Sequence, residues 1–215
     1  MRINLIRQNS FMLSIPKARI IARLMADGSI NKSRHNYRIR YEVKDEESLK
    51  NFEKDIYLVY GLKMTRGLNP SGKTNEWIPF VNLYSKKVYE DLLRYGNYRS
   101  YNWSLPNQIK KSSNKIKTEF LRAFYDDEGS VICNNKTNSI EIRLYSINKK
   151  GLLQLKSLLE KFGIYSRLAK GYGLKRNVFA IVVNRKKEVK KFSKLIGFNL
   201  KRKQEKLIQG LNNKL

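Results

Sequence analysis

Two acidic residues stand at matching places in two similar stretches of the sequence. Asp27 follows "RIIARLMA" and precedes Gly28, and Glu128 follows "EFLRAFYDD" and precedes Gly129. The apolar spacing of both stretches predicts helices, so each acid is expected at a helix C-terminus. A helix C-terminus is partially negative, and a carboxylate there is unfavourable. If the two helices meet, their carboxylates raise each other's pKa or attract a cation.

The chemistry that such a pair of acids favours is metal-dependent hydrolysis. Carboxylates together with the last carbonyls of a helix are the oxygen ligands that suit Mg²⁺, so Asp27, Glu128, Ala26 and Asp127 are candidate metal ligands. A divalent metal held between two carboxylates and a phosphate can activate water and stabilise a leaving oxygen. The alternative interpretation is that Asp-Gly and Glu-Gly are plain helix stops, which is the usual role of one such turn alone. Their recurrence at equivalent places favours the functional interpretation.

The sequence repeats itself with a period of about one hundred residues. Besides the two acids, Gly61 is matched by Gly163 and Gly96 by Gly197. A repeat of this length indicates a duplicated domain and two halves related by a pseudo-twofold axis. We assign residues 1–104 to the first half, 105–117 to a polar linker and lead-in, and 118–215 to the second half.

Small residues indicate how the two halves meet. Ala22 and Ala26 are four residues apart and share one stripe of their helix, and Ala123 takes the place of Ala22 in the second half. Small residues on a stripe allow two helix backbones to approach closely. The predicted joint is therefore a two-helix seam, with Asp27 and Glu128 as neighbours at its end.

Each half has the pattern of an αββαββα unit, which places the protein in the α+β class. In "NYRIRYEVK" the apolar residues alternate with Arg38, Arg40, Glu42 and Lys44, and "SIEIRLYS" alternates in the same way. We expect one four-stranded antiparallel sheet in each half, with helices on one face and a polar, mostly basic second face.

The charge balance points to a polyanionic partner. Lys and Arg number 45 against 18 Asp and Glu, which gives a net charge of +27. Nucleic acid is the leading interpretation because the basic residues are spread along the whole chain, and an anionic membrane surface is the second. The sequence has no apolar run long enough to span a membrane, no pattern of a signal peptide and one cysteine, Cys133, so an intracellular protein is expected.

A sheet with a basic polar face fits the DNA major groove, where side chains read base edges. The alternative is an ordinary solvated sheet face. The residues expected to contact DNA lie on the predicted strands and hairpin loops: Arg34, Arg38, Arg40, Glu42, Arg66, Lys73, Lys136, Glu141, Arg143, Tyr145, Arg167, Lys170, Lys175 and Arg176.

The stretches "IIARLMADG" and "LRAFYDDEG" resemble the two signature motifs of the LAGLIDADG homing endonucleases. The resemblance extends over nearly the whole chain and is to the single-chain, two-motif, intron-encoded type. The first motif departs from the pattern at Arg23 and Met25. The resemblance implies a monomeric, site-specific endonuclease that cleaves both strands of a long asymmetric DNA site and leaves short 3′ overhangs. It also implies Mg²⁺ as the cofactor, with Mn²⁺ as a substitute, and a location in the cytoplasm, nucleoid or an organelle matrix.

The resemblance also implies basic or polar residues beside the cleaved phosphates. The segment "GFNLKRKQEKL" is similar to the family's C-terminal lysine segment, which assigns a pocket lysine to Lys203, with Lys201 as the alternative if the register slips. The first half has no matching lysine, and Lys44 is the substitute there. Asn148 stands where the family often has an amide or a lysine. A solvated or phosphate-positioning side chain is the competing interpretation for each lysine.

Two other functions remain open on the same fold. One is an RNA-splicing maturase, with the protein's own intron RNA as a further partner, and the other is a regulator that binds DNA without cutting it. A protein that only binds gains nothing from two carboxylates in a basic groove, because they repel phosphate. The pair of acids therefore favours catalysis.

Overall fold

The computed structural model describes residues 12–71, 76–134, 139–171 and 177–212. The first half contains seven elements in the order α2 (Ile15–Ala26), β1 (Gly28–Ser33), β2 (Asn36–Glu42), α3 (Glu46–Tyr60), β3 (Thr65–Pro70), β4 (Trp77–Tyr84) and α4 (Lys86–Leu93). Lys73, Lys136, Lys175 and Arg176, which we expected to contact DNA, lie outside the described residues.

The second half repeats the same order after the short helix α5 (Asn107–Lys111). Its elements are α6 (Asn114–Glu128), β5 (Gly129–Asn134), β6 (Ser139–Ser146), α7 (Lys149–Lys161), β7 (Arg167–Lys170), β8 (Phe179–Val183), α8 (Lys186–Leu195) and the additional helix α9 (Lys201–Asn212). The predicted αββαββα order is confirmed in both halves, and α5 and α9 are additions to it.

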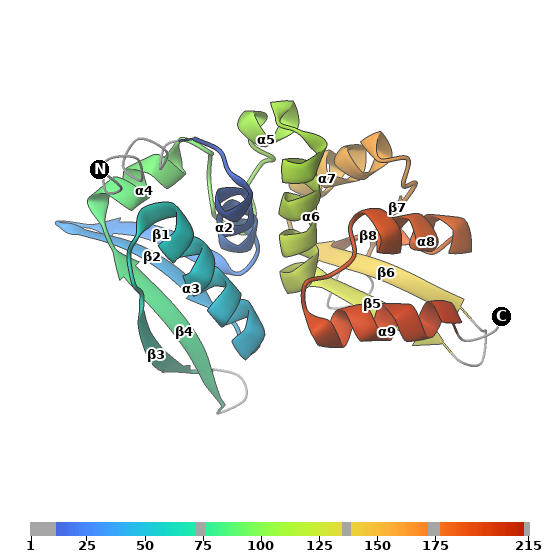
Figure 1. Ribbon diagram of the computed structural model, residues 1–215, viewed down its shortest axis with the longest axis horizontal. Coiled ribbons are helices and arrows are strands. Elements are labelled where there is room, and N and C mark those ends of the chain that lie inside the picture. The colour runs from blue at the N-terminus through green and yellow to red at the C-terminus, as the bar shows by residue number, and fades with distance from the viewer. Residues whose placement is uncertain (1–11, 72–75, 135–138, 172–176, 213–215) are drawn as a thin grey trace.

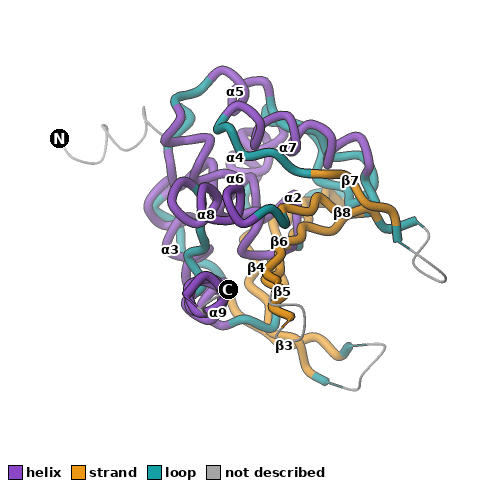
Figure 2. Tube along the Cα trace, turned by 90° about the vertical axis from the view of Figure 1, so that its right-hand side faces the viewer, coloured by secondary structure: helices purple, strands orange, loops and turns teal. Residues whose placement is uncertain are grey.

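The two sheets have the same topology, with strand orders β1-β2-β4-β3 and β5-β6-β8-β7 and antiparallel pairing throughout. Helices lie together on one side of the molecule and strands on the other (Figure 2). The predicted α+β fold, with helices on one face of each four-stranded sheet, is therefore confirmed. Within the described residues, no helix has both the length and the apolar character needed to cross a bilayer.

The alternation in the strands decides which face of each sheet is buried. Ile39 and Tyr41 of β2 are fully buried under the helices, as are Ile142 and Leu144 of β6. The residues between them, including Arg40 and Arg143, point to the opposite face. The helix layer thus covers the apolar face of each sheet and leaves the polar faces uncovered.

The repeated glycines end helices in a conformation that favours glycine. Gly61 follows α3 with φ 68°, and Gly163 follows α7 with φ 67°. In this left-handed region a Cβ atom is disfavoured. The matching positions of these helix ends show why the glycine spacing indicated a duplicated domain.

Helices α2 and α6 pack side by side along the joint between the halves (Figure 1). Ala18 and Ala22 of α2 and Ala123 of α6 are fully buried, and Ala26 is partly buried at the end of the joint. Small side chains here let the two helix axes approach closely, so both helix C-termini arrive at the same end of the molecule.

Ala123→Leu should weaken this joint. An added isobutyl group has to displace packed neighbours at a fully buried position, which costs about 1–3 kcal/mol in the free energy of unfolding. Urea unfolding followed by circular dichroism measures the change. Ser157→Leu, on the exposed side of α7, is the control and should stay near wild type. An Ala123→Leu protein as stable as the control would contradict the close packing.

Candidate catalytic centre and nucleic-acid interface

Asp27 and Glu128 end the two central helices at the same end of the joint. Asp27 is the residue after the last turn of α2, and Glu128 is the last residue of α6. Burial raises the pKa of Asp27 to about 6, and Lys203 opposes the shift. Burial and then the charge of Asp27 raise the pKa of Glu128 to about 8, again opposed by Lys203. The acids are therefore close enough for their charges to interact.

The glycine after each acid lets the chain turn directly from helix into strand. A Cβ atom on Gly28 would lie 2.6 Å from the Cα of Leu24, and one on Gly129 would lie 3.0 Å from the Cα of Tyr125. Contacts this short would push each strand away from the last turn of its helix. Glycine therefore fixes the acid at the point where helix and sheet meet.

Asp127 connects the halves through its side chain. The hydroxyl of Tyr41, buried in the first half, donates a 2.7 Å hydrogen bond to Oδ1 of Asp127. Burial raises the pKa of Asp127 well above its usual value, Arg23 lowers it, and the charge of Asp27 raises it further. A third carboxyl group therefore lies at the joint, but a tyrosine holds it.

Lys203 neutralises the negative end of α6. Its side chain is buried, and Nζ donates to the carbonyls of Asp126 and Gly129, with longer contacts of 3.3 and 3.4 Å to those of Tyr125 and Asp127. Burial and then Arg202 lower the pKa of Lys203, while the surrounding aspartates raise it. The structure thus places Lys203 near the acids, with its ammonium group held by carbonyls of the α6 terminus.

Two pockets flank the acids, and their linings correspond between the halves. The pocket beside Asp27 is lined by Lys44, Ile78, Asp127 and Arg202 among others. The pocket beside Glu128 has Ile147, Val178, Ala26 and Trp103 at or near the corresponding places. The strand registers support the match, because Tyr41 in the first half and Leu144 in the second pair with the starts of β1 and β5.

The two pockets differ in charge. Lys44 and Arg202 give the first pocket two cationic side chains, although Lys44 also pairs with Glu76 and Arg202 with Asp45 at 2.9 Å. The lining of the second pocket holds no lysine or arginine among the described residues. Ala26 stands there where Asp127 stands in the first pocket. The centre is therefore pseudo-symmetric in shape and asymmetric in chemistry.

Asn148 has another role than the predicted catalytic one. It caps α7, where Oδ1 accepts from the Gly151 amide at 3.0 Å and Nδ2 donates to the Trp103 carbonyl at 2.6 Å. Its side chain is 4% exposed. Both ends of the amide are thus engaged in the fold, which argues against the prediction and removes Asn148 from the candidate site.

The polar faces of the two sheets carry most of the described residues that we expected to contact DNA. Strand register places Arg38, Arg40, Glu42, Glu141, Arg143, Tyr145 and Arg167 on these faces, opposite the buried strand residues. Arg34 is exposed in the two-residue turn between β1 and β2. Arg40 and Arg143 are oriented by Glu42 and Glu141, respectively.

Two of the predicted DNA contacts lie on the helix side instead. Arg66 pairs in register with buried Val81, and its guanidinium binds Glu46 and Glu53 of α3. Lys170 is two residues after Leu168, which packs against the core, so it shares the helix face of β7. The structure therefore argues against a DNA contact by Arg66 or Lys170, because alternation along a short edge strand puts them on the covered face.

Comparison with known proteins identifies the second half directly. The family model of the LAGLIDADG-like domain matches residues 115–197. The second half of the chain is a LAGLIDADG-like domain. The motif helix of this domain is α6, and α2 is its structural counterpart in the first half.

Relatives in Methanocaldococcus jannaschii are similar over most of the chain. Uncharacterized protein MJ1054 is 25% identical, over 84% of this chain and 21% of its own length. Uncharacterized protein MJ0314 is 28% identical, over 68% of this chain and 54% of its own length. The chain thus spans about half or less of the length of these two relatives.

Solved structures share the two-domain LAGLIDADG fold. The homing endonuclease I-DmoI covers 94% of this chain and 99% of its own at a TM-score of 0.65 and 17% identity. The homing endonuclease I-WcaI, bound to its DNA recognition sequence, covers 90% of this chain and 85% of its own at a TM-score of 0.66 and 16% identity. Full-length WhiA from Thermatoga maritima also matches, at a TM-score of 0.61 and 13% identity, over 98% of this chain and 66% of its own.

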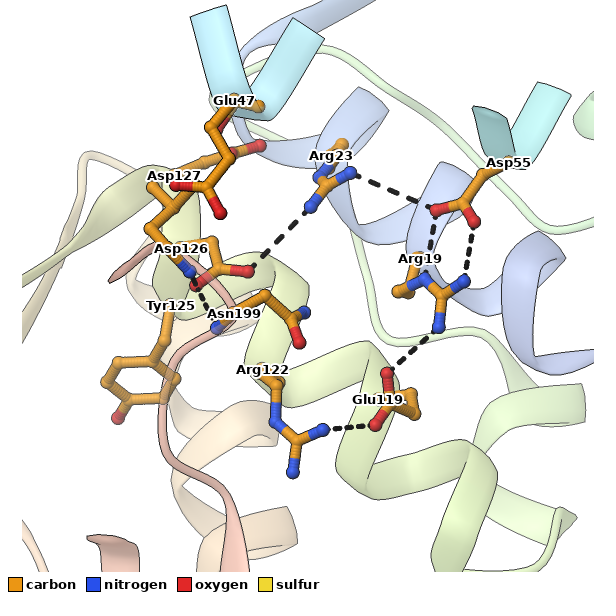
Figure 3. Close-up of polar contacts among 12 residues, drawn as sticks. Arg19, Arg23, Glu47, Asp55, Glu119, Arg122, Tyr125, Asp126, Asp127 and Asn199 are labelled. Carbon is orange, nitrogen blue, oxygen red and sulfur yellow. Dashed lines mark hydrogen bonds and ion pairs between the residues drawn. The ribbon is translucent and has the colours of Figure 1, made fainter. Parts of the chain in front are cut away.

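A network of ion pairs across the LAGLIDADG helices is the feature that the sequence did not reveal (Figure 3). Arg19 of α2 binds Asp55 of α3 at 2.5 and 2.9 Å and Glu119 of α6 at 3.0 Å. The Arg23 guanidinium is fully buried, 3.9 Å from Asp55 and 3.7 Å from Asp126. Arginines four residues apart inside an apolar helix were the available signal.

Asp126 extends this network to the C-terminal segment. Its Oδ1 accepts from the backbone amides of Asn199 at 2.9 Å and Leu200 at 3.3 Å, just before α9. The same segment positions Arg202 and Lys203 beside the acids. The departure from the motif at Arg23 therefore belongs to an arrangement that ties α3, α2, α6 and the start of α9 together.

The raised pKa of Glu128 predicts a pH-dependent stability. Because the folded pKa of about 8 exceeds the ordinary value of 4.5, the folded state favours the protonated acid, and this stability is lost as pH rises through about 8. Glu128→Gln should therefore gain stability relative to wild type between about pH 5 and pH 9, by about 3 kcal/mol at most.

Urea unfolding of both proteins across this pH range, without divalent metal, measures the difference. Glu90→Gln on exposed α4 is the control and should show a difference that stays constant with pH. A constant difference for Glu128→Gln as well would contradict the burial and the charge interaction inferred at the joint.

Proposed function

We propose that the protein is a site-specific DNA endonuclease that hydrolyses both strands of a long, asymmetric duplex site with the help of a divalent metal. The observation that carries the proposal is the meeting of Asp27 and Glu128 at the joint between two basic sheet faces. The single chain supplies both acids and both sheets, which supports action as a monomer on DNA inside the cell.

The sheet faces suit the reading of duplex DNA. Each presents arginines and acids from adjacent strands, and strands of a ribbon fit the major groove. The two halves are similar in fold and different in sequence, which supports an asymmetric site. I-DmoI, which has the same fold, was solved with its target DNA in the presence of Mg, with DNA and Mn, and with DNA and Ca.

The residues at the joint fit a hard divalent cation such as Mg²⁺ or Mn²⁺. Asp27 and Glu128 are carboxylates whose raised pKa values reflect a place where negative charge is costly, and a cation relieves that cost. No three His, Cys, Asp or Glu side chains gather as a metal-binding group within the described residues. Two carboxylates leave coordination places for phosphate and water.

The metal, when bound, would lower the pKa of a water molecule and stabilise the leaving oxygen. Asp27 and Glu128 would hold it, and the Ala26 and Asp127 carbonyls are further candidate ligands, the latter shared with Lys203 at 3.4 Å. Lys44 and Arg202 would offset phosphate charge in the pocket beside Asp27. Lys203 would act as a positioning residue, because it holds the end of α6 and opposes the raised pKa of both acids.

A DNA-binding protein that does not cut is the second candidate. The observation that favours it is the neutral, largely apolar pocket beside Glu128, where Ile147, Val178 and Trp103 stand instead of charged side chains. Cleavage of one strand or of neither strand would follow if this pocket cannot support hydrolysis. Product analysis of both strands distinguishes these outcomes.

Asp27→Asn and Glu128→Gln should each reduce cleavage about 100-fold or more while DNA binding is retained, because each removes a charge that holds the metal and repels phosphate. A random duplex library with Mg²⁺ first identifies the cleaved site, and gel assays then measure the rate on each strand. Glu90→Gln is the control. Wild-type rates for both site variants would refute the assignment of the acids.

DNA affinity should fall steeply with salt, through arginines on the sheet faces. Arg38→Gln and Arg167→Gln should each lower the slope of log Kobs against log salt by about 0.9, if each arginine neutralises one phosphate. Arg66→Gln is the matched control, since its guanidinium is bound by α3 on the helix side. An equal loss for Arg66→Gln would contradict the assignment of the sheet faces as the DNA interface.

A further inference from the structure

The outer face of α8 carries a row of lysines on the helix side of the molecule. Lys186, Lys190 and Lys194 recur every fourth residue and so share one stripe, with Lys187 beside it. All four side chains are exposed, and none forms an ion pair with another residue in the described part of the chain. We define these four residues as the α8 lysine face.

The inner side of α8 shows which way this face points. Val189 and Phe192 are fully buried, and α8 packs against β6 from the helix side. Lys191 is used within the fold, where Nζ donates to the carbonyl of Gly163 at 2.6 Å. The lysine face therefore points away from the sheets (Figures 1 and 2), and a duplex bound to the polar sheet faces would not reach it.

The equivalent helix in the first half shows that the fold does not require this charge. Helix α4 has two lysines and two acids, Glu90 and Asp91, whereas α8 has five lysines and one acid. Lys86 pairs with Glu90 at 3.8 Å, and buried Asp91 binds Lys17 at 2.6 Å. Since the two helices have the same place in their halves, the excess positive charge of α8 is specific to the second half.

The neighbouring helices enlarge the difference. Helix α3 of the first half carries more acids than lysines, whereas α7 and α9 of the second half add exposed Lys149, Lys150, Lys161, Lys201 and Lys206. The helix layer is thus strongly basic in one half only. Such a surface attracts a polyanion by its charge.

We propose that the α8 lysine face is a second, sequence-independent binding surface for duplex DNA, so that one molecule holds two duplex segments. The row from Lys186 to Lys194 spans about 12 Å, a length over which a duplex carries about seven phosphates. Lysines are point charges without the bidentate geometry that reads bases, so they bind phosphate wherever it lies.

Single-stranded nucleic acid is the competing ligand. Binding of single strands uses aromatic platforms on which bases stack. Helix α8 itself exposes no aromatic side chain, and Tyr165 beside it has the ammonium of Lys191 5.9 Å from its ring centroid. A face made of lysines on a rigid helix favours the regular phosphates of a duplex.

A sandwich assay tests the proposal. An immobilised short duplex of arbitrary sequence is saturated with the Asp27→Asn protein, and capture of a second, fluorescent duplex is measured. The triple variant Lys186→Gln/Lys190→Gln/Lys194→Gln should capture about tenfold less, because three phosphate contacts are lost. The matched control Lys50→Gln/Lys86→Gln/Lys87→Gln removes the same charge from the first half and should capture as much as its parent.

Three results would overturn the proposal: equal capture by both triple variants, displacement of the second duplex by single-stranded RNA at lower concentration than by unlabelled duplex, or capture that tracks a protein dimer in sedimentation. Circular dichroism verifies that both variants are folded. Because cleavage plays no part in the assay, a wild-type protein that captures the second duplex and never cuts would refute only the proposed nuclease function.

Discussion

The placement of two like charges at one point is the constraint on which the rest of the structure depends. Helices α2 and α6 bring their negative C-termini together, and each adds a carboxylate there, Asp27 and Glu128. The raised pKa values of both acids show that this costs stability. Small side chains in the helix joint and glycines after the acids hold the arrangement in place.

The surrounding residues compensate for that cost unequally in the two halves. Lys203 neutralises the end of α6, Tyr41 binds Asp127, and Arg23 lies buried between Asp55 and Asp126. Removing one partner from such a buried set leaves an uncompensated charge. The first motif has no equivalent of Asp126 or Asp127, so a duplicated fold has become a centre with two chemically different pockets.

Regular patterns made the fold predictable, whereas contacts between distant segments were not. Strand alternation and repeated acids gave both sheets and the two-helix joint. Parity on the short edge strands was misjudged at Arg66 and Lys170, and Asn148 was assigned by position although its amide caps a helix. Helix α9 was not expected because its lysine-rich sequence shows little apolar pattern, and it packs through Gly210 against Cys133. The Arg23 network depends on where α3 lies and could not be read from spacing.

The most direct test of the central claim is an NMR titration of the Glu128 carboxyl group, in wild type and in Asp27→Asn, without metal. If the two acids meet at the joint, removing the charge of Asp27 should lower the pKa of Glu128 from about 8 toward its ordinary range, leaving only the part caused by burial. An identical pKa in both proteins would show that the acids do not interact, and the account of a shared centre would be wrong.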